Sequence, residues 1–232
     1  MLELDGLRWR AGDFALEAEM QIAPGDRVAV IGPSGAGKST LLDLVAGFRS
    51  PEVGRVLWQG RDLGPLSPAA RPVTILFQDN NLFPHLSIAR NLGLAVRPDG
   101  RRPDAAQTGR IGDALARVGL SGFEDRLPGS LSGGQQSRAA LARVLVQDRP
   151  VLLLDEPFAA LGPALRAEML DLVAEVTADT GALVLLVSHD PKDALRFAPQ
   201  AIVVAEGRAH APADTATLLD DPPPALRAYL GH

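Results

Sequence analysis

The stretch RVAVIGPSGAGKST (27–40) decides the fold. Its first part, RVAVIG (27–32), is a continuous apolar run typical of a strand buried on both faces of a sheet. The second part fits the pattern G-x-x-x-x-G-K-[ST] from Gly32 to Ser39, and a helical pattern follows it. Because glycines let the backbone approach phosphates and a helix start offers free N–H groups, this stretch predicts a phosphate-binding loop.

The side chains of this loop are those that a magnesium nucleotide requires. Lys38 is placed to reach the β- and γ-phosphates, and the Ser39 hydroxyl is placed to bind Mg²⁺. An ordinary glycine-rich turn that happens to match is the alternative, but the strand–loop–helix context argues against it. The predicted nucleotide-binding residues are Gly32, Pro33, Ser34, Gly35, Ala36, Gly37, Lys38, Ser39 and Thr40.

A second informative stretch is VLLLDEP (151–157), where four apolar side chains lead into two adjacent carboxylates. Burying an unpaired carboxylate costs several kcal/mol. Either the pair emerges into solvent at a strand end, or a cation is held there. With a magnesium nucleotide at this edge, Asp155 pairs with the cation and Glu156 acts as the general base for the attacking water.

The rest of the chain alternates strand and helix patterns, which implies a parallel sheet covered by helices on both faces. A first strand is expected at Leu2, Leu4 and Leu7, and the others cover 14–22, 27–32, 56–58, 73–77, 151–155, 182–187 and 201–205. The expected helices cover 39–46, 88–95 and 163–178, with one opening at SGGQ (132–135) and a short one after Asp190. Ile111, Leu115 and Val118 share a helical face. The mainly helical sequence pattern between Asp79 and Leu131 indicates an insertion into an α/β domain.

Composition excludes several classes of protein. The formal net charge of -5 argues against a nucleic-acid-binding face, because such faces are usually basic. With 0 cysteines, the chain has neither disulfides nor thiolate metal sites. The longest apolar runs, such as ALVLLV (182–187), fall far short of the roughly 18–20 residues that span a bilayer. A role in a membrane process would therefore be exercised from outside the bilayer.

The motif LSGGQ (131–135), which precedes the DEP strand, resembles the signature sequence of ATP-binding-cassette (ABC) proteins. Ser132, Gly133 and Gly134 leave N–H groups bare at a helix start and so predict a second anion site; a simple helix cap is the alternative. Two phosphate sites far apart in one chain suggest a head-to-tail homodimer, in which Ser132 to Gln135 cap the ATP bound by the partner.

Further matches to ABC transporter ATPases follow in the expected order, and the resemblance covers nearly the whole chain. Gln78 ends a strand, like the family's glutamine that contacts magnesium and water. His189 in LVSHD resembles the histidine that grips the γ-phosphate, although a lone histidine after a strand is often structural. Trp9 lies near the position of the family's ring against adenine, and an ordinary packed tryptophan is an equal alternative.

The resemblance implies the ABC ATPase fold. This is an α/β, P-loop NTPase (RecA-like) core with a mainly parallel sheet, an antiparallel β edge and a helical subdomain insertion. We expect a single domain over 1–232, with its core at 1–78 and 151–211, the helical subdomain with the signature motif at 79–150, and a short tail at 212–232.

The chain departs from the family pattern in two segments. After the DEP strand the family usually has S-A-L-D, whereas this chain has AALG (159–162). That aspartate normally ties the two subunits together, so with Gly162 in its place we expect looser coupling between the two ATP sites. Ser137 stands where importers commonly carry glutamine, a difference of little weight.

Within the family, the segment ARPVTILFQDNNLFPHLSIARNLGL (70–94) resembles the ATPases of bacterial thiamine importers, with Asn80 and Asn81 as its most distinctive feature. Such ATPases dock the membrane subunits here. The residues Leu82, Phe83, Pro84, Leu86 and Ile88 form an apolar patch for a partner helix. The alternative is that Leu86 and Ile88 pack the insertion's own core.

The resemblance implies ATP and Mg²⁺ as ligands and a homodimer beneath two transmembrane permease subunits. A periplasmic thiamine-binding protein would complete the complex, no nucleic acid is involved, and the chain would be peripheral to the cytoplasmic face of the inner membrane. Alternatives are an importer of another small solute, an ABC ATPase of translation or DNA maintenance, and a small-molecule kinase.

Overall fold

The computed structural model describes residues 1–79 and 81–230, so Asn80 and the last two residues of the predicted tail lie outside the description. The strands are β1 Leu2–Ala11, β2 Phe14–Ile22, β3 Arg27–Ile31, β4 Val53–Trp58, β5 Arg61–Asp62, β6 Val73–Leu76, β7 Val151–Asp155, β8 Leu183–Val187, β9 Gln200–Ala205, β10 Arg208–Ala209 and β11 Ala213–Asp214. The α-helices are α1 Lys38–Ala46, α2 Ile88–Val96, α3 Ala105–Arg117, α4 Gly133–Leu145, α5 Pro163–Ala178, α6 Pro191–Phe197, α7 Thr215–Asp220 and α8 Pro224–Leu230.

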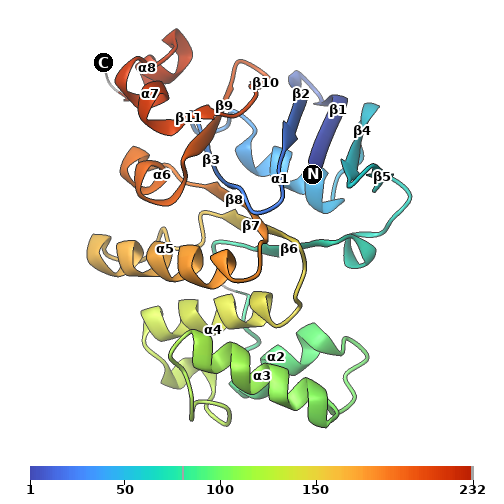
Figure 1. Ribbon diagram of the computed structural model, residues 1–232, viewed down its shortest axis with the longest axis vertical. Coiled ribbons are helices and arrows are strands. Elements are labelled where there is room, and N and C mark those ends of the chain that lie inside the picture. Colours follow the sequence, from blue (N-terminus) through green and yellow to red (C-terminus); the bar gives the residue numbers. More distant parts are fainter. Residues whose placement is uncertain (80, 231–232) are drawn as a thin grey trace.

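The strands form one sheet with the order β5-β4-β1-β2-β10-β9-β3-β8-β7-β6, and β11 pairs with β9 (Figure 1). The neighbours β9, β3, β8, β7 and β6 all run parallel. The apolar runs of the sequence become the buried strands of this part, β3, β7 and β8. The predicted mainly parallel sheet is therefore confirmed.

The other end of the sheet is antiparallel, as expected. Strand β1 pairs with both β2 and β4, and β4 pairs with β5. From Leu16 to Ile22 the residues of β2 alternate between buried and exposed, which confirms the half-buried strand. The two-residue strands β5, β10 and β11 carry no pattern that predicts them, and β4 begins at Val53, earlier than expected.

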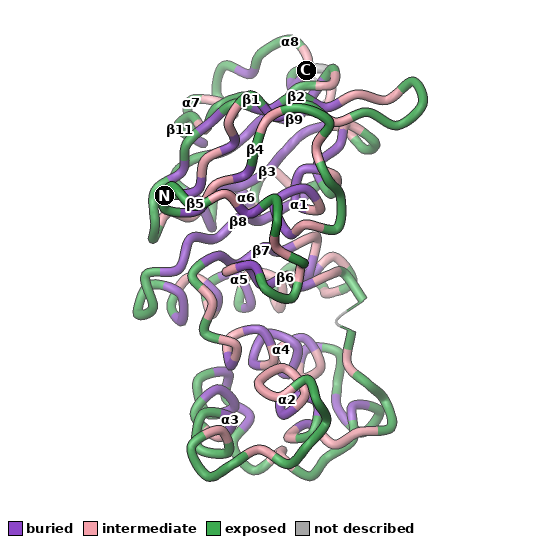
Figure 2. The backbone as a smooth tube through the Cα atoms, turned by 90° about the vertical axis from the view of Figure 1, so that its right-hand side faces the viewer, coloured by how far each residue is buried: buried purple, intermediate pink, exposed green. Residues whose placement is uncertain are grey.

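Hydrophobic layers cover both faces of the sheet, because successive side chains of a strand point to opposite faces. Val28 and Val30 of β3 pack in one layer with the buried side of α1. Ala29 and Ile31 pack in the other layer, which includes residues of α4, α5 and α6. Figure 2 shows the buried residues concentrated along the strands and on the inner sides of the helices.

Helices α2, α3 and α4 lie together beyond the parallel edge of the sheet (Figures 1 and 2). Ile111 and Leu115 of α3 are buried, as their spacing predicts, and Val118 is buried just after the helix. Ile88 is fully buried, so it packs the core and is not available to a partner helix, whereas Phe83 is 39% exposed. The division into core, insertion and tail stays a prediction.

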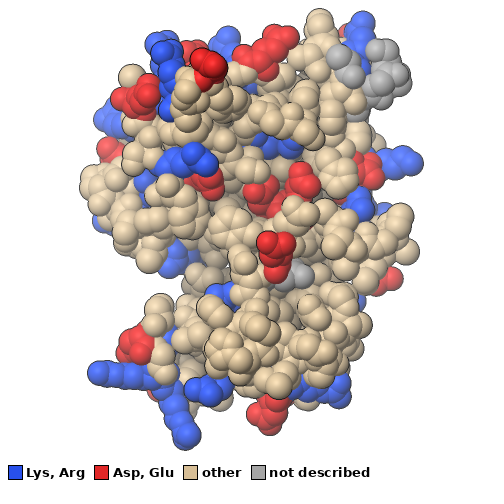
Figure 3. Space-filling view, turned by 180° about the vertical axis from the view of Figure 1, so that it is seen from behind, with Lys and Arg blue, Asp and Glu red and all other residues tan. Residues whose placement is uncertain are grey.

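None of the helices in the described part of the chain is long and apolar enough to cross a bilayer. On the face drawn in Figure 3, acidic and basic side chains of the described residues are interspersed.

Candidate functional site

The carboxyl ends of four parallel strands meet at one edge of the sheet, the usual place for a ligand in an α/β fold. Strand β3 leads into the glycine-rich loop, and β7 ends at Asp155, directly before Glu156. His189 follows β8, and Gln78 follows β6. The topology thus brings these predicted residues to a common edge, although they are far apart in sequence.

Close packing and backbone conformation require glycine at two positions of the loop. Gly32 has φ 146°, and a Cβ there would lie 2.0 Å from the carbonyl oxygen of Val204 on β9. Gly37 has φ 107°, and its Cβ would lie 2.8 Å from the ring of Phe14. The sequence motif therefore reflects contacts with β9 and β2 as well as space for phosphate.

Lys38 is folded under the loop. Its Nζ donates hydrogen bonds to the carbonyl oxygens of Gly32 at 2.8 Å and Pro33 at 2.9 Å. Only 8% of the residue is exposed, and this burial lowers the pKa of the Lys38 amine, while the nearby carboxylates of Glu156 and Asp155 act in the opposite direction. The amine is held next to the backbone amides on which phosphates would lie.

Ser39 and Asp155, two of the residues predicted to hold Mg²⁺, are joined by a hydrogen bond. The Ser39 Oγ donates to Asp155 Oδ1 at 3.1 Å. Burial raises the pKa of the Asp155 carboxyl, and the hydrogen bond from Ser39 only partly offsets this effect. Asp155 is thus a carboxylate whose charge is incompletely compensated.

This oxygen pair fits Mg²⁺, which prefers oxygen ligands and keeps several waters or phosphate oxygens around it. Among the described residues, no three His, Cys, Asp or Glu side chains gather to hold a metal. Ser39 and Asp155 would therefore supply a hydroxyl and a carboxylate oxygen to such a cation.

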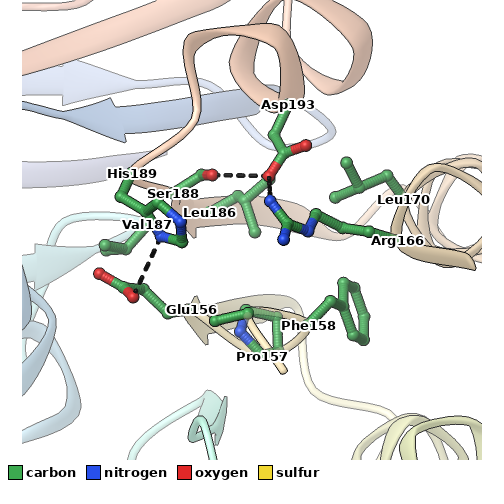
Figure 4. Close-up of a pocket in the computed structure, with 11 residues that line it drawn as sticks. Glu156, Pro157, Phe158, Arg166, Leu170, Leu186, Val187, Ser188, His189 and Asp193 are labelled. Carbon is green, nitrogen blue, oxygen red and sulfur yellow. Dashed lines mark hydrogen bonds and ion pairs between the residues drawn. The ribbon is translucent and has the colours of Figure 1, made fainter. Parts of the chain in front are cut away.

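Glu156 and His189 point toward one another, with His189 Nδ1 lying 3.4 Å from Glu156 Oε2 (Figure 4). Glu156 has φ 47°, an uncommon conformation for a residue with a side chain. Its N–H donates to the carbonyl of Val187 at 3.2 Å, which ties the end of β7 to the end of β8. The backbone therefore directs this carboxylate, which is the arrangement expected of a general base with a partner.

An open cleft of about 380 Å³ lies in front of the loop, a size that suits a small-molecule ligand. Its lining residues are Trp9, Ala11, Phe14, Ser34, Gly35, Gly37, Lys38, Ser39, Thr40 and Glu156. Trp9 therefore lines this cleft and also packs against a buried hydrophobic cluster, so its contact with adenine stays a prediction. Its ring lies 6.1 Å from that of Phe14 and 4.8 Å from the guanidinium of Arg49. Neither of these two neighbours belongs to a motif, so the sequence did not identify them.

The signature residues form a different kind of structure. Ser132 caps α4, accepting from the Gln135 N–H at 3.3 Å, while the Gln135 side chain accepts from the Ser132 N–H at 3.0 Å. Ser132 thus caps the helix, and Ser132 and Gly133 are exposed outside the cleft lining. The second anion site stays a prediction. Gln78 is also exposed and outside that lining.

The segment after the DEP motif is exposed at Gly162. Gly162 caps the start of α5, and a Cβ at this position would meet nothing within 4 Å. A larger side chain would therefore fit there.

The family model for ABC transporters matches residues 16–159. The chain belongs to the ABC transporter family. Its cassette fold is shared with a nucleotide-free ATP-binding cassette from an ABC transporter, at 24% identity and a TM-score of 0.88, over 100% of this chain and 99% of the other. A dimeric bacterial ABC transporter cassette is similar at 27% identity, with a TM-score of 0.77 over 93% of this chain and 99% of that one.

Curated relatives are similar over their full length. A thiamine import ATP-binding protein of Cereibacter sphaeroides is 63% identical over 231 residues, covering 100% of both chains. One from a Ruegeria species is 60% identical over 232 residues, again with 100% of both chains covered. As an ABC transporter ATPase, the chain binds ATP.

Proposed function

We propose that this chain is the ATP-hydrolysing subunit of an ABC importer for thiamine and its phosphates. The observation that supports thiamine as the transported solute is the 63% identity, over the whole chain, to a protein named for thiamine import. The geometry supports the ATPase role, since Lys38, Ser39, Asp155, Glu156 and His189 all belong to one edge of the sheet.

In this proposal the loop and Lys38 bind the phosphates, and Trp9 packs against the adenine. The cleft supports this division, because its wall is apolar at Trp9, Ala11 and Phe14 and polar at Lys38 and Ser39. Lys38 gives up its bonds to two loop carbonyls and donates to phosphate oxygens instead. The lowered pKa of the buried Lys38 amine agrees with a site that gains from an incoming anion.

Ser39, Asp155 and Gln78 hold Mg²⁺ in this proposal, with Ser39 as the direct ligand. Bound Mg²⁺ supplies positive charge to the phosphate oxygens. The raised pKa of the Asp155 carboxyl supports the assignment, since burial leaves that negative charge without a full partner.

For hydrolysis, Glu156 accepts a proton from water, the water oxygen bonds to the γ-phosphorus, and the bond to the ADP oxygen breaks. His189 donates to the γ-phosphate from its place beside Glu156, where the two side chains are 3.4 Å apart. The contact orients both groups, and each remains partly exposed to an incoming ligand.

The catalytic unit is a head-to-tail homodimer. Ser132, Gly133, Gly134 and Gln135 lie outside the cleft of their own chain, which supports their use on the ATP of a second copy. A related cassette has been solved as a dimer. The protein cbiO1 of Clostridium perfringens is described as part of an ABC transporter complex. It is 28% identical, with a TM-score of 0.84 over 95% of this chain and 90% of that one.

The homodimer works beneath two transmembrane permease subunits on the cytoplasmic face of the inner membrane, and a periplasmic thiamine-binding protein delivers the solute. We also infer that 79–150 is the helical subdomain facing the permease, joined to the core at 1–78 and 151–211. The exposed Phe83 supports a contact in this region.

Growth on limiting thiamine tests the substrate. Deleting the gene should make low external thiamine growth-limiting, and the intact gene should restore growth, whereas a Glu156→Gln copy should not. If the deletion strain instead becomes limited for another solute, the thiamine assignment is wrong while the ATPase role stands.

A further inference from the structure

Helix α8 contacts the backbone of the proposed catalytic histidine. The hydroxyl of Tyr229 donates a hydrogen bond to the main-chain carbonyl oxygen of His189. These residues are far apart in sequence, and the sequence contains 1 tyrosine. Tyr229 lies outside the glycine loop, the DEP motif, the signature segment and the other residues assigned to ATP binding or hydrolysis.

The position of Tyr229 is fixed by the way α8 is seated. Leu226 on the same helix is fully buried, and it belongs to the hydrophobic cluster that also contains Phe197 of α6. Arg227 forms an ion pair with Asp221 at 3.1 Å and donates to the Pro222 carbonyl at 3.3 Å. The Tyr229 side chain itself packs against the cluster. The hydroxyl is therefore presented by an anchored helix.

Other bonds hold the residues on either side of His189. Ser188 donates to Asp193 at 2.8 Å, and Arg166 lies 3.6 Å from Asp193 (Figure 4). Arg166 also lies 3.7 Å from Asp190. These bonds come from α5 and α6 and fix the neighbouring residues. Tyr229 contacts the peptide of His189 itself, from which the imidazole extends toward Glu156.

The phenol remains a donor at neutral pH. Burial raises the pKa of Tyr229, and the negative charges of Glu156 and Asp190 raise it further. The neutral form, which carries the donated proton, is thus favoured. The same two carboxylates show that the phenol lies within electrostatic reach of the catalytic edge.

We propose that Tyr229 is a positioning residue for ATP hydrolysis, whose hydrogen bond orients the His189 peptide so that the imidazole meets Glu156 and the γ-phosphate. This inference rests on the proposed role of His189. Helix α8 then takes part in positioning the hydrolytic residues. The proposal also predicts that nucleotide binding at the ATP site changes the environment of Tyr229 on α8 through its bond to His189.

The direct test is Tyr229→Phe, which removes the hydroxyl and keeps the ring. Loss of one hydrogen bond that orients a reacting group should lower kcat about 3- to 10-fold. The KM for ATP should change less than about twofold, because the lost contact does not touch the phosphate-binding loop. If Tyr229 had only a structural role, Tyr229→Phe would instead lower the thermal unfolding midpoint, and it would not lower kcat at a nearly unchanged KM. Pro224→Ala, at the exposed start of the same helix, is the matched control and should keep the wild-type kcat.

The tyrosine also supplies a direct probe. In protein labelled with meta-fluorotyrosine, one fluorine resonance reports on Tyr229, since the sequence holds 1 tyrosine. In a Glu156→Gln background, magnesium ATP should shift that resonance, and ADP should shift it less. This measurement stands even if Tyr229→Phe fails to fold.

The outcomes separate the two proposals. His189→Ala is the reference: if it keeps full kcat, the proposed role of His189 is wrong. The other outcome is that His189→Ala is inactive while Tyr229→Phe has normal kcat and magnesium ATP leaves the fluorine resonance unshifted. In that case only the role of Tyr229 is overturned.

Discussion

The glycine loop at 32–40 and the signature segment at 131–135 are both glycine-rich starts of helices, but they are built differently. The first is surrounded by its own chain: Lys38 is buried beneath it, and β9 and β2 contact its glycines. The second closes its own helix start with a capping box and leaves Ser132 and Gly133 exposed. The first segment lines a cleft within the chain, and the second is the one that we propose to contact the ATP of a second copy.

The largest expected effect lies at the catalytic edge. Glu156→Gln should keep ATP binding and lower kcat by roughly 10²–10⁴, because the general base is lost while the cleft is intact. Steady-state hydrolysis and equilibrium ATP binding provide the measurement. Glu206→Gln is the matched control, since Glu206 is an exposed glutamate that also has positive φ and follows a strand. Normal turnover in Glu156→Gln would remove this residue from the role.

The signature segment gives the next largest effect. A carboxylate in Gly133→Asp would face the phosphates of the partner's ATP, where like charges at about 4 Å repel by about 4 kcal/mol near a protein surface. We expect hydrolysis to fall by about 10² and the ATP-dependent dimer to be lost, while a single chain still binds ATP. A Cβ at Gly133 meets only the Leu161 side chain, at 4.0 Å, so the fold should tolerate it.

Gly129→Asp serves as the control for that experiment, because Gly129 is exposed just before the signature segment and its Cβ would meet nothing within 4 Å. Dimer formation is measured by size-exclusion chromatography with light scattering. A normal ATP-dependent dimer in Gly133→Asp would contradict the proposal that the signature segment contacts the ATP bound by the partner's loop.

A smaller effect concerns stability. Burial raises the pKa of Asp155 above its unfolded value of 3.8, so the folded state binds more protons and this group costs stability once the pH exceeds the folded pKa. At neutral pH, Asp155→Asn should therefore raise the unfolding midpoint of the nucleotide-free protein, with about 1 kcal/mol corresponding to about 2–4 °C. The difference should shrink as the pH falls through the folded pKa toward 3.8. Equal midpoints for variant and wild type at neutral pH would argue against an uncompensated charge.

The smallest effect is expected after the DEP motif. Gly162→Asp introduces the acidic side chain that the family usually carries, in a place with room for it. We expect the cooperativity of hydrolysis to rise and kcat to change less than about threefold. ATP titrations of hydrolysis measure the Hill coefficient. An unchanged coefficient would mean that Gly162 does not loosen the coupling between the two sites.

The sequence predicted features that depend on local chemistry. The loop after β3 was predictable because its glycines and lysine occur at fixed spacing, and β7 because four apolar residues precede Asp155. Helices α2 and α5 were also expected within one residue of their observed bounds. These are long or strongly patterned elements whose residues satisfy their own periodicity.

The features that escaped prediction depend on distant contacts. Strands β10 and β11 have two residues each, and their pairing with β2 and β9 gives them their structure. Phe14 and Arg49 become neighbours of Trp9 only through the fold. The capping box between Ser132 and Gln135 was also missed, although a serine followed three residues later by a glutamine is a known sequence signal for it. The contact between Tyr229 and His189 likewise has no local signature.

The aromatic wall of the cleft has a consequence for base selectivity. Trp9 and Phe14 line the cleft, and stacking on an aromatic ring accepts any nucleobase, because every base has a π-face. Most polar groups of the lining belong to the loop, where the proposed binding mode puts the triphosphate. We therefore expect the cassette to use GTP nearly as readily as ATP, so that the abundance of each nucleotide in the cell, more than the protein, decides which one fuels transport.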